Sequence, residues 1–419
     1  MTGASYYAVT NSLDVEHYQE LVDRGWRRSG TLLYKPDVLR SCCPHYTIRL
    51  PVASFKPRRD QRQAINRWNR YVAGEAYYAE AARLRPKSKG EKARQRTEFD
   101  LIETVHESEY DRLPEPPEQE HQFKVTLEPD TFTEEKFKLY ANYQQVVHHD
   151  KPSEITRTGF KRFLCGSPLQ RTSRALNGKT QSLGSFHQCY RLDGRLIAIG
   201  IIDLLPHCVS GVYFIYHEDF EKWSFGKLSA LREAALALEE GYEFYYMGYY
   251  IHPCTKMRYK GEYKPQHVLD PETNEWNPLE PEIRQLLDNK KFVSLSREQR
   301  LNEAAPETSE PEKVDLDRTD IDGYQYGSPT EAAGAANSGL SLFSFRMPGI
   351  MTLEELMTQV DLGKISISLG GGMLVKMEDL VSFEDSSPLD SHSLKGLIAE
   401  LAACVGPIVA KEMVVKLST

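Results

Sequence analysis

The chain has 419 residues, an apolar share of 40% and a formal net charge of −8. This length is sufficient for two or three domains with a substantial core. The longest apolar run, at 196–205, contains Asp203 and is too short to span a bilayer, so we expect no membrane association. Seven irregularly spaced cysteines and the absence of a basic-then-apolar leader indicate an intracellular, reducing compartment.

Basic residues are concentrated in one block of the chain. Residues 49–96 contain fourteen Lys or Arg and four acidic residues, which leaves the remainder strongly acidic. Such a block typically contacts nucleic acid or an anionic surface, and a solvated basic helix is the alternative.

The first fifty residues are expected to fold compactly. Apolar periodicity predicts an amphipathic helix at 13–25, and short strands are predicted at 32–34 and 46–50. The loop between the strands carries adjacent Cys42 and Cys43. Adjacent cysteines seldom bridge each other and the sequence contains no C-x-x-C motif, so two buried thiols and part of a metal site both stay open.

An arginine-rich helix is predicted next. Arg58, Arg59 and Arg62 have spacings that place several guanidinium groups along one face, with Trp68 and Tyr71 interleaved. Planar aromatic groups beside arginines are suited to stacking on RNA bases. Acidic residues are nearly absent here, which favours RNA contact over a plain solvated face.

The middle of the chain mixes charged helices with linkers. We predict a charged helix at 77–96, a linker at 114–120, a strand at 123–127 and a helix at 134–149. Lys161 and Arg162 lie in an amphipathic turn that could grip an anion, and a surface helix with two extended basic side chains is the alternative. Residues 171–182 are polar and predict a mobile loop.

A hairpin and a strand–helix–strand segment form the centre of the predicted fold. The hairpin joins strands at 186–191 and 196–202 through an Asp-Gly turn, and Asp203 follows as either a turn residue or an acid exposed in a cleft. A strand at 212–216, a helix from Ser224 to Gly241 and an aromatic strand at 244–250 come next. The helix N-terminus would direct free N–H groups at a phosphate, a carboxylate or an oxyanion.

The last third divides into two parts. Residues 301–345 are rich in small and acidic residues and predict a disordered linker. From Met347 a small unit follows, ending in an apolar helix at 394–415 that Pro407 interrupts.

Four long segments resemble the arginyl-tRNA–protein transferase family. They are DRGWRRSGTLLYKP, LRSCCPHYTIRLPVASFKPRRDQRQ, FKRFLC, and DLLPHCVSGVYFIYHEDFEKWSFGKLSALRE with FYYMGYYI after it. The resemblance implies an α+β chain: a GNAT-like acyltransferase domain, in which helices flank a mixed sheet, an N-terminal α/β domain and a small C-terminal unit. The expected segments are 1–72 (N-terminal domain), 73–120 (charged helix and linker), 121–295 (catalytic domain), 296–345 (acidic linker) and 346–419 (C-terminal unit).

The resemblance also implies the activity. The family moves arginine from Arg-tRNA to the N-terminal α-amine of proteins that begin with Asp, Glu or oxidised Cys, marking them for ubiquitin-dependent degradation. Arg-tRNA, these proteins and the ubiquitin ligase of the N-degron pathway are therefore the expected partners, in the cytoplasm and also the nucleus. A coenzyme A-dependent N-acetyltransferase on the same core and an inactive RNA-binding homologue are the alternatives.

The family also carries a cysteine site in its N-terminal domain. There a C-x-x-C pair joins two later adjacent cysteines to bind zinc, an iron–sulfur cluster or haem. Cys42 and Cys43 match the later half, whereas the C-x-x-C pair would precede Ser5 and is absent from this sequence. The chemistry itself needs no cofactor, because an aminoacyl ester is already activated.

Aminolysis of an ester requires placement of the amine and stabilisation of an oxyanion. The segment WSFGKLS has one glycine where coenzyme A users carry a glycine-rich loop, which favours a tRNA end. The catalytic candidates are Asp203 and Glu233, and an exposed helix position is the alternative for Glu233. The donor end of the tRNA is expected at Trp223, Gly226, Lys227, Tyr249 and Tyr250. The tRNA or the acceptor carboxylate is expected at Arg27, Arg28, Arg49, Arg58, Arg59, Arg62, Lys161 and Arg162.

Overall fold

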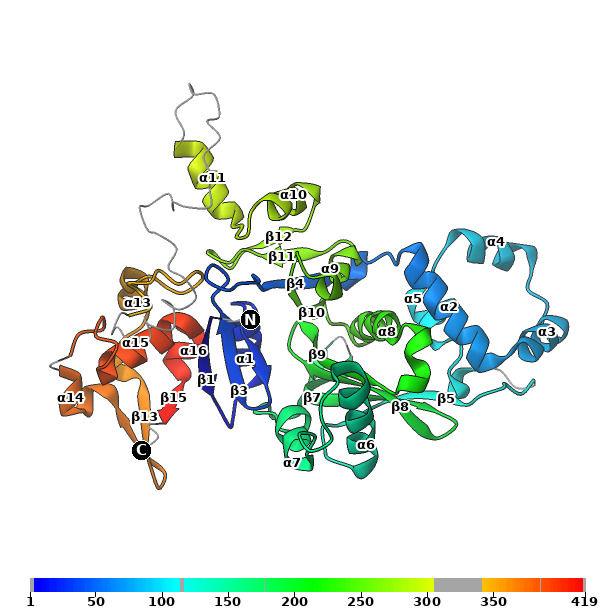
Figure 1. Cartoon of the computed structure of the whole chain (residues 1–419), viewed down its shortest axis with the longest axis horizontal. Coiled ribbons are helices and arrows are strands. Elements are labelled where there is room, and N and C mark those ends of the chain that lie inside the picture. The colour runs from blue at the N-terminus through cyan, green and yellow to red at the C-terminus, as the bar shows by residue number, and fades with distance from the viewer. Residues whose placement is uncertain (1–3, 114–116, 177, 305–340, 385, 417–419) are drawn as a thin grey trace.

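Three β-sheets organise the part of the chain that the computed structural model describes, which is residues 4–113, 117–176, 178–304, 341–384 and 386–416 (Figure 1). The N-terminal sheet has the order β1-β3-β2, the large sheet β12-β11-β4-β10-β9-β8-β7-β5 with β6 on β7, and the C-terminal sheet β14-β13-β15. The strands are β1 (Ser5–Val9), β2 (Arg27–Ser29), β3 (Leu32–Pro36), β4 (Tyr46–Pro51), β5 (Phe123–Pro129), β6 (Thr172–Leu176), β7 (Lys179–Leu192), β8 (Arg195–Leu204), β9 (Cys208–Tyr216), β10 (Phe244–Tyr250), β11 (His267–Leu269), β12 (Trp276–Pro278), β13 (Ser366–Gly370), β14 (Met373–Lys376) and β15 (Val414–Lys416).

Helices cover both faces of the large sheet. They are α1 (Val15–Val22), α2 (Arg59–Ala73), α3 (Glu75–Leu84), α4 (Lys89–Thr97), α5 (Leu101–His106), α6 (Glu134–Tyr143), α7 (Arg157–Phe160), α8 (Phe225–Glu240), α9 (Thr255–Arg258), α10 (Pro281–Asn289), α11 (Leu295–Ala304), α13 (Leu353–Gln359), α14 (Val381–Glu384), α15 (Leu394–Val405) and α16 (Pro407–Glu412). In this described part, no helix is long and apolar enough to cross a membrane.

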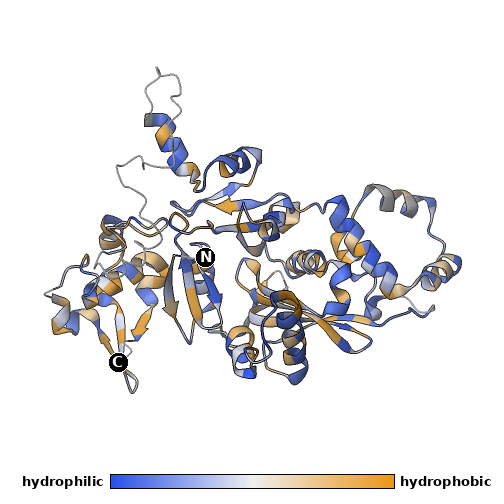
Figure 2. Cartoon of the chain, in the orientation of Figure 1, coloured by the Kyte–Doolittle hydropathy of each residue, from blue (hydrophilic) through white to orange (hydrophobic). Residues whose placement is uncertain are grey.

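The buried strand β8 explains the layering. Its side chains divide between two apolar clusters, one shared with α8 and α2 and the other with α6 and α7. A strand covered on both faces needs a nearly continuous apolar sequence, which RLIAIGIIDL supplies. Figure 2 shows the apolar colouring concentrated in the strands and on the inner faces of the helices.

The strand–helix–strand segment forms as predicted. Helix α8 begins after Ser224, which has a left-handed φ of 60°, and ends at Gly241 with φ 79°. Glycine tolerates this C-cap conformation because it has no Cβ. Strand β10 occupies the predicted positions and runs parallel to β9.

Two helical predictions need correction. The charged segment 77–96 is two helices, α3 and α4, because Pro86 lies between them and cannot continue a helix. Figure 1 shows both projecting from the end of the molecule beyond α2. The final apolar segment ends as β15 on β13, after α16 stops at Glu412.

Residues 171–182 are not a loop. They form a hairpin in which β6 pairs with the start of β7, and Arg174 donates to Gln181 across the strands at 2.7 Å. Polar residues that pair across strands stabilise a sheet as apolar ones do, which the composition did not reveal.

Elements from different predicted segments pack against one another. Strand β4, from segment 1–72, lies in the large sheet between β10 and β11. The first part of segment 296–345 belongs to helix α11, and residues 305–340 lie outside the described part. The C-terminal unit contacts α1 through α16, and the Trp26 indole donates to the Cys404 carbonyl oxygen at 3.0 Å.

Candidate functional site at the separation of strands β9 and β10

Strands β9 and β10 start as neighbours and then separate. Phe244 to Tyr246 of β10 pair with Cys208 to Ser210 of β9, and the pairing described between these two strands ends there. Each strand has an irregularity at this point, β9 near Gly211 and β10 between Tyr246 and Tyr249. Bulges bend a strand and are frequent beside active sites. We call the resulting space, from Gly211 on β9 and Gly248 on β10, the β9–β10 opening.

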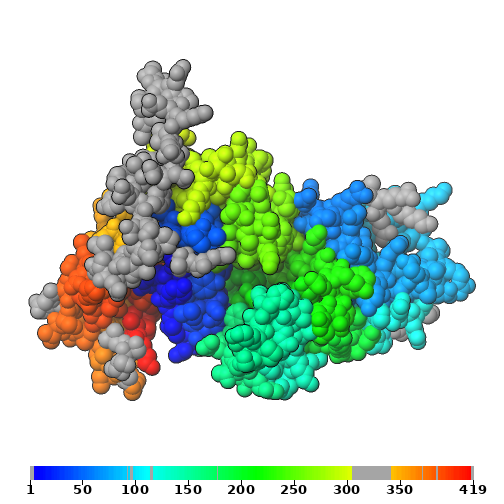
Figure 3. Space-filling view, viewed as in Figure 1, coloured from blue at the N-terminus to red at the C-terminus, as the bar shows by residue number. Residues whose placement is uncertain are grey.

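The surface is hollowed near this opening. Figure 3 shows a recess between the teal lobe of α6 and α7 and the yellow-green lobe that contains α9 and α10. Both lobes are packed against strands of the large sheet. A substrate that entered the recess would approach the sheet where its strands part.

Glu233 lies at the base of the opening. The residue is 3% exposed, and its carboxylate lies over two glycines: a Cβ at Gly200 would be 3.3 Å from Oε1, and one at Gly211 would be 3.1 Å from Oε2. Burial raises the pKa of Glu233 to about 7, although a hydrogen bond with Tyr245 and the charge of Lys260 act in the opposite direction. A carboxylate with this pKa can hold or release a proton near neutral pH.

Lys260 reaches the opening from the segment after β10. Its ammonium donates to the Tyr249 carbonyl oxygen at 3.1 Å and lies 3.7 Å from where a Cβ on Gly248 would be. Burial lowers the pKa of Lys260 to about 8, with Arg27 acting in the same direction and Glu233 against it. Gly248 has φ 76°, a conformation that favours glycine.

Arg27 provides a second cation, and this one is buried. Its Nη1 donates to the carbonyl oxygens of Trp26 at 2.6 Å and Val22 at 3.3 Å, and its guanidinium carbon lies 5.2 Å from the centre of the Tyr249 ring. Its Nε and Nη2 have no hydrogen-bond partner among the described residues. A buried guanidinium with spare donors is costly unless a ligand completes it.

Arg28 and Asp203 pair with each other. Both side chains are buried, Arg28 donates to the Asp203 carboxylate at 2.6 and 2.7 Å, and Ser185 donates to it as well. Asp203 is therefore not an acid exposed in a cleft, and Arg28 is not free to meet a phosphate. An acid at the end of an apolar strand has found a buried partner that lies far away in the sequence.

Arg49 is also engaged within the fold. Its guanidinium is sandwiched between Phe244 at 3.9 Å and Trp276 at 4.1 Å and donates to the Tyr246 hydroxyl at 3.3 Å. This cation–π arrangement holds β4 against β10 and β12. Arg49 therefore has a structural position in this fold.

The arginines of α2 remain on the surface. Arg59 and Arg62 are exposed, and Arg58 forms an ion pair with Glu262 in the segment that carries Lys260. Lys227, at the start of α8, pairs with Asp60 of α2 at 2.8 Å. Ion pairs thus join helix α2 to the start of α8 and to the segment that carries Lys260.

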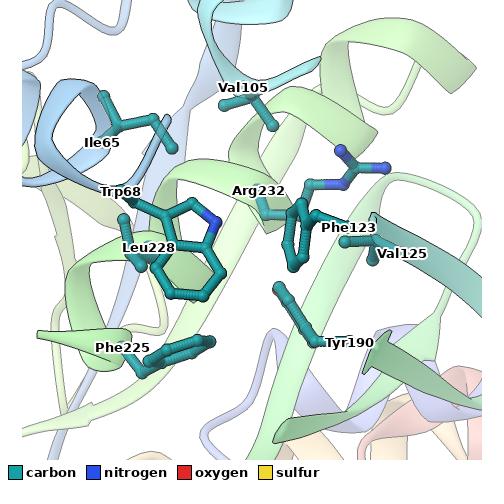
Figure 4. Close-up of a pocket in the computed structure, with 9 residues that line it drawn as sticks. All are labelled: Ile65, Trp68, Val105, Phe123, Val125, Tyr190, Phe225, Leu228 and Arg232. Carbon is teal, nitrogen blue, oxygen red and sulfur yellow. The ribbon is translucent and has the colours of Figure 1, made fainter. Parts of the chain in front are cut away.

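The aromatic residues divide into surface and core. Trp223 stacks on Tyr71 at 4.4 Å beside Gly226, which is exposed, whereas Tyr249 donates to the Gly25 carbonyl oxygen and Tyr250 is buried against His252. Trp68, which we expected beside RNA, is 1% exposed. It lines a small apolar space under α2 (Figure 4), with Ile65, Val105, Phe123, Val125, Tyr190, Phe225, Leu228 and Arg232.

Lys161 and Arg162 lie in the segment directly after α7. Both are exposed in a π-helical turn after α7, and the Lys161 ammonium lies 4.4 Å from the Phe132 ring. Such turns are frequent at functional sites. Their place is consistent with contact to a substrate, which stays a prediction.

Comparisons with known proteins identify the family. Residues 2–63 match the domain described as "Arginine-tRNA-protein transferase, N terminus", and residues 135–270 match the corresponding C-terminal domain. Arginyl-tRNA–protein transferase 1 of Drosophila melanogaster is 31% identical, over 70% of this chain and 80% of the relative. This chain belongs to the arginyl-tRNA–protein transferase family.

Two further relatives also carry the names of aminoacyltransferases. Arginyl-tRNA–protein transferase 1 of Saccharomyces cerevisiae is 33% identical over 68% of this chain, which spans 55% of that relative's length. The aspartate/glutamate leucyltransferase of Pseudomonas fluorescens Pf0-1 is 30% identical over 61% of this chain and 81% of the relative. All these names denote aminoacyltransferases.

The cysteines do not complete the metal site expected of an arginyltransferase. Cys42 and Cys43 have their sulfur atoms 3.7 Å apart, and within the described residues no three His, Cys, Asp or Glu side chains are grouped to hold a metal ion. Structural zinc takes four ligands, so the residues present do not fit the group.

The sequence did not indicate that Lys260 and Tyr245 both lie near Glu233. Lys260 is one of four Lys or Arg residues between β10 and β11, and only the fold shows it beside Gly248. The glycines at 200, 211 and 248 were the available signal, because glycines inside strands often mark a close approach.

Proposed function

We propose that this protein transfers arginine from Arg-tRNA to the N-terminal α-amine of proteins that begin with Asp, Glu or oxidised Cys, and so marks them for ubiquitin-dependent degradation. The observation that carries the proposal is the position of α8. Its first turn is joined to the exposed arginine helix α2, and its inner face presents Glu233 to the β9–β10 opening. One helix therefore links a surface suited to RNA with a site suited to acyl transfer.

The tRNA would lie along α2. Exposed Arg59, Arg62 and Arg67 provide positive charge, and Trp223 with Tyr71 provides aromatic surface at the start of α8. Phosphate contacts position a nucleic acid, and aromatic side chains can support unpaired bases. The 3′ end would then pass the start of α8 to reach the opening.

The chemistry requires a neutral amine. A protein's α-amino group has a pKa near 8, so a base near the ester increases the reactive fraction. Glu233, with a pKa of about 7, suits this role because it is deprotonated in part of the molecules at neutral pH. The amine nitrogen attacks the arginyl carbonyl carbon, and a proton passes from the amine to Glu233. The bond to the ribose oxygen then breaks, and this oxygen leaves with the bonding electron pair and is protonated to the hydroxyl.

Arg27 would recognise the acceptor. Its two unpartnered donors are buried beside Tyr249, where a carboxylate from an acceptor's Asp or Glu side chain could complete them. The aspartate/glutamate leucyltransferases among the relatives carry the same acid preference in their names. Arg27 is thus our candidate for acceptor selection.

We further propose that the large sheet and its helices form a GNAT-like acyltransferase core. Two parallel strands separate above a helix that follows the first of them, which leaves inner edges to which a donor can bind. A coenzyme A-dependent acetyltransferase would use the same opening, and an inactive homologue would keep only the RNA surface. The seven free thiols fit a reducing compartment, and we expect a cytoplasmic and nuclear location.

Labelled donors separate these functions. Arg-tRNA carrying labelled arginine and labelled acetyl-coenzyme A are each incubated with peptides that begin with Asp or with Val and are otherwise identical. We expect label from Arg-tRNA on the Asp peptide alone. Label from acetyl-coenzyme A would support the acetyltransferase, and tRNA binding without any transfer would support the inactive homologue.

Acceptor selection by Arg27 needs its own variants. Arg27→Met keeps much of the side-chain volume and removes the charge, so it should raise the KM for the Asp peptide by ten-fold or more with little change in tRNA affinity. Arg195→Met removes an exposed arginine that pairs with Asp219 and has no expected role in the site, so it is the control and should leave the KM unchanged. An unchanged KM in Arg27→Met would remove Arg27 from acceptor recognition.

A further inference from the structure

Lys260 is a partly buried cation whose donors are only partly used. Within the described residues its ammonium has one hydrogen bond, to the Tyr249 carbonyl oxygen at 3.1 Å. An ammonium has three N–H donors, so two remain for another acceptor. The cation lies beside Gly248, where a Cβ would be 3.7 Å from Nζ and 3.9 Å from the Gly211 carbonyl oxygen.

The two glycines make this space accessible. Gly211 belongs to β9 and Gly248 to β10, so the space between them is the point where the strands part. Any side chain at Gly248 would occupy it, and the positive φ of 76° independently favours glycine. The ammonium therefore lies beside the gap between the two strands.

The groups around Lys260 define its charge. Arg27 approaches from β2, Glu233 from α8, Cys254 from the turn before α9 and Tyr249 from β10. Arg27 disfavours the charged form, whereas Glu233 and Cys254 favour it. A cation and a carboxylate thus face the same gap from opposite elements.

We propose that Lys260 is a catalytic residue of the transfer, donating a hydrogen bond to the arginyl carbonyl oxygen and a proton to the departing ribose oxygen. The proposal rests on the proposed function. It adds an acid to the base already assigned, and it uses the two donors that the fold leaves free.

The proton and electron balance closes without a further reactant. The amine nitrogen bonds to the carbonyl carbon, and the π pair moves to the oxygen beside the Lys260 ammonium. That pair returns as the carbon–ribose oxygen bond breaks, with its electrons on the ribose oxygen, which takes a proton from Lys260. The proton that Glu233 accepted from the amine then passes to Lys260, directly or through water, and both groups are restored.

The effect of removal can be bounded. Loss of one oxyanion donor typically lowers kcat by about 10²–10³, and loss of a general acid by about 10²–10⁴. Lys260→Met, which is close in shape, should therefore slow single-turnover transfer by about 100-fold or more. The Kd for Arg-tRNA should stay within about two-fold, because the RNA surface on α2 is separate.

The pH profile distinguishes an acid from a structural cation. With a pKa of about 8, Lys260 loses its proton as pH rises, so the wild-type rate should fall above pH 8. Lys260→Arg keeps a charge that does not titrate in this range, so it should restore part of the rate and lose the fall above pH 8. Lys256→Met removes an exposed lysine from adjacent α9 and is the matched control.

The outcomes separate the two proposals. Catalysis by Lys260 is supported if the wild-type protein transfers arginine, Lys260→Met is slow, Lys260→Arg restores part of the rate and Lys256→Met has the normal rate. Wild-type rates and an unchanged alkaline limb in Lys260→Met would overturn this inference and leave the transferase intact. If Lys260→Met does not fold, Lys260→Arg with the unaltered wild-type profile refutes the acid role. No transfer by the wild-type protein would refute both proposals.

Discussion

Individual buried charges differ in whether the fold satisfies them. Arg28 and Asp203 satisfy each other's hydrogen-bonding groups. Arg27, Glu233 and Lys260 instead lie around one opening. Among the described residues, Arg27 and Lys260 keep N–H donors without a partner, and Glu233 can gain or lose a proton. A partly satisfied buried polar group costs stability, so such groups tend to mark functional sites. This contrast separates a structural ion pair from the candidate site.

The Arg28–Asp203 pair should contribute to stability. Asp203→Asn leaves a buried guanidinium without its countercharge, and breaking a buried pair from one side typically costs about 3–5 kcal/mol. We expect a loss of this order in the free energy of unfolding, measured by urea denaturation. The double variant Arg28→Met with Asp203→Leu should recover much of it. A stable but inactive Asp203→Asn protein would instead support the catalytic role expected from the sequence.

Glu233 should lower stability at high pH. Its folded pKa of about 7 exceeds the ordinary value of 4.5, so the folded state holds a proton that the unfolded state has released between these values. Stability is therefore fullest below pH 4.5 on account of this group and falls as pH rises towards 7. Glu233→Gln should remove that fall, be more stable than the wild type at pH 8 and lose transfer. Equal stability of the two proteins at pH 8 would contradict the raised pKa.

Among the elements, the proposed function depends most on helices α2 and α8. The sequence predicted both helices, the ends of α8 at Ser224 and Gly241, and the aromatic strand after α8, because residue spacing and Gly241 are local signals. It did not predict that Trp68 faces the core while Arg59 and Arg62 stay on the surface. That division depends on which face of α2 meets α8, which is a tertiary contact.

The arginine face of α2 should determine the salt dependence of tRNA binding. Replacing Arg58, Arg59 and Arg62 with Ala should weaken binding and reduce the slope of log K against log salt by about one for each phosphate that the protein no longer neutralises. Lys364→Ala with Lys411→Ala removes exposed charge from the C-terminal unit and should change neither value. An unchanged slope in the triple variant would remove this face from the RNA site.

On the scale of the whole molecule, distant segments converge on one sheet. The order of strands places β4 between β10 and β11, and β2 brings Arg27 to Tyr249. Local patterns identified most strands near the centre of the sheet but could not give their neighbours, since pairing between residues 46 and 250 leaves no local signal. For the same reason the pairing of Asp203 with Arg28 could not be predicted, and Lys260 was overlooked.

The C-terminal unit should support the N-terminal sheet. Trp26 is fully buried and precedes Arg27, and its indole donates to the Cys404 carbonyl oxygen. Trp26→Phe loses this hydrogen bond and some packing, so we expect a lower Tm and a raised KM for the Asp peptide. Normal peptide affinity at a lowered Tm would limit the unit to a stabilising role.

In the proposed function the arginyl ester lies in the β9–β10 opening and the tRNA lies on α2. A structure with tRNA that carries arginine through a 3′ amide, which resists transfer, tests this directly. We predict the arginyl carbonyl oxygen within hydrogen-bond distance of Lys260 Nζ, with the acceptor stem against Arg59 and Arg62. An arginyl group bound away from the opening, or a stem on the face opposite α2, would contradict the account.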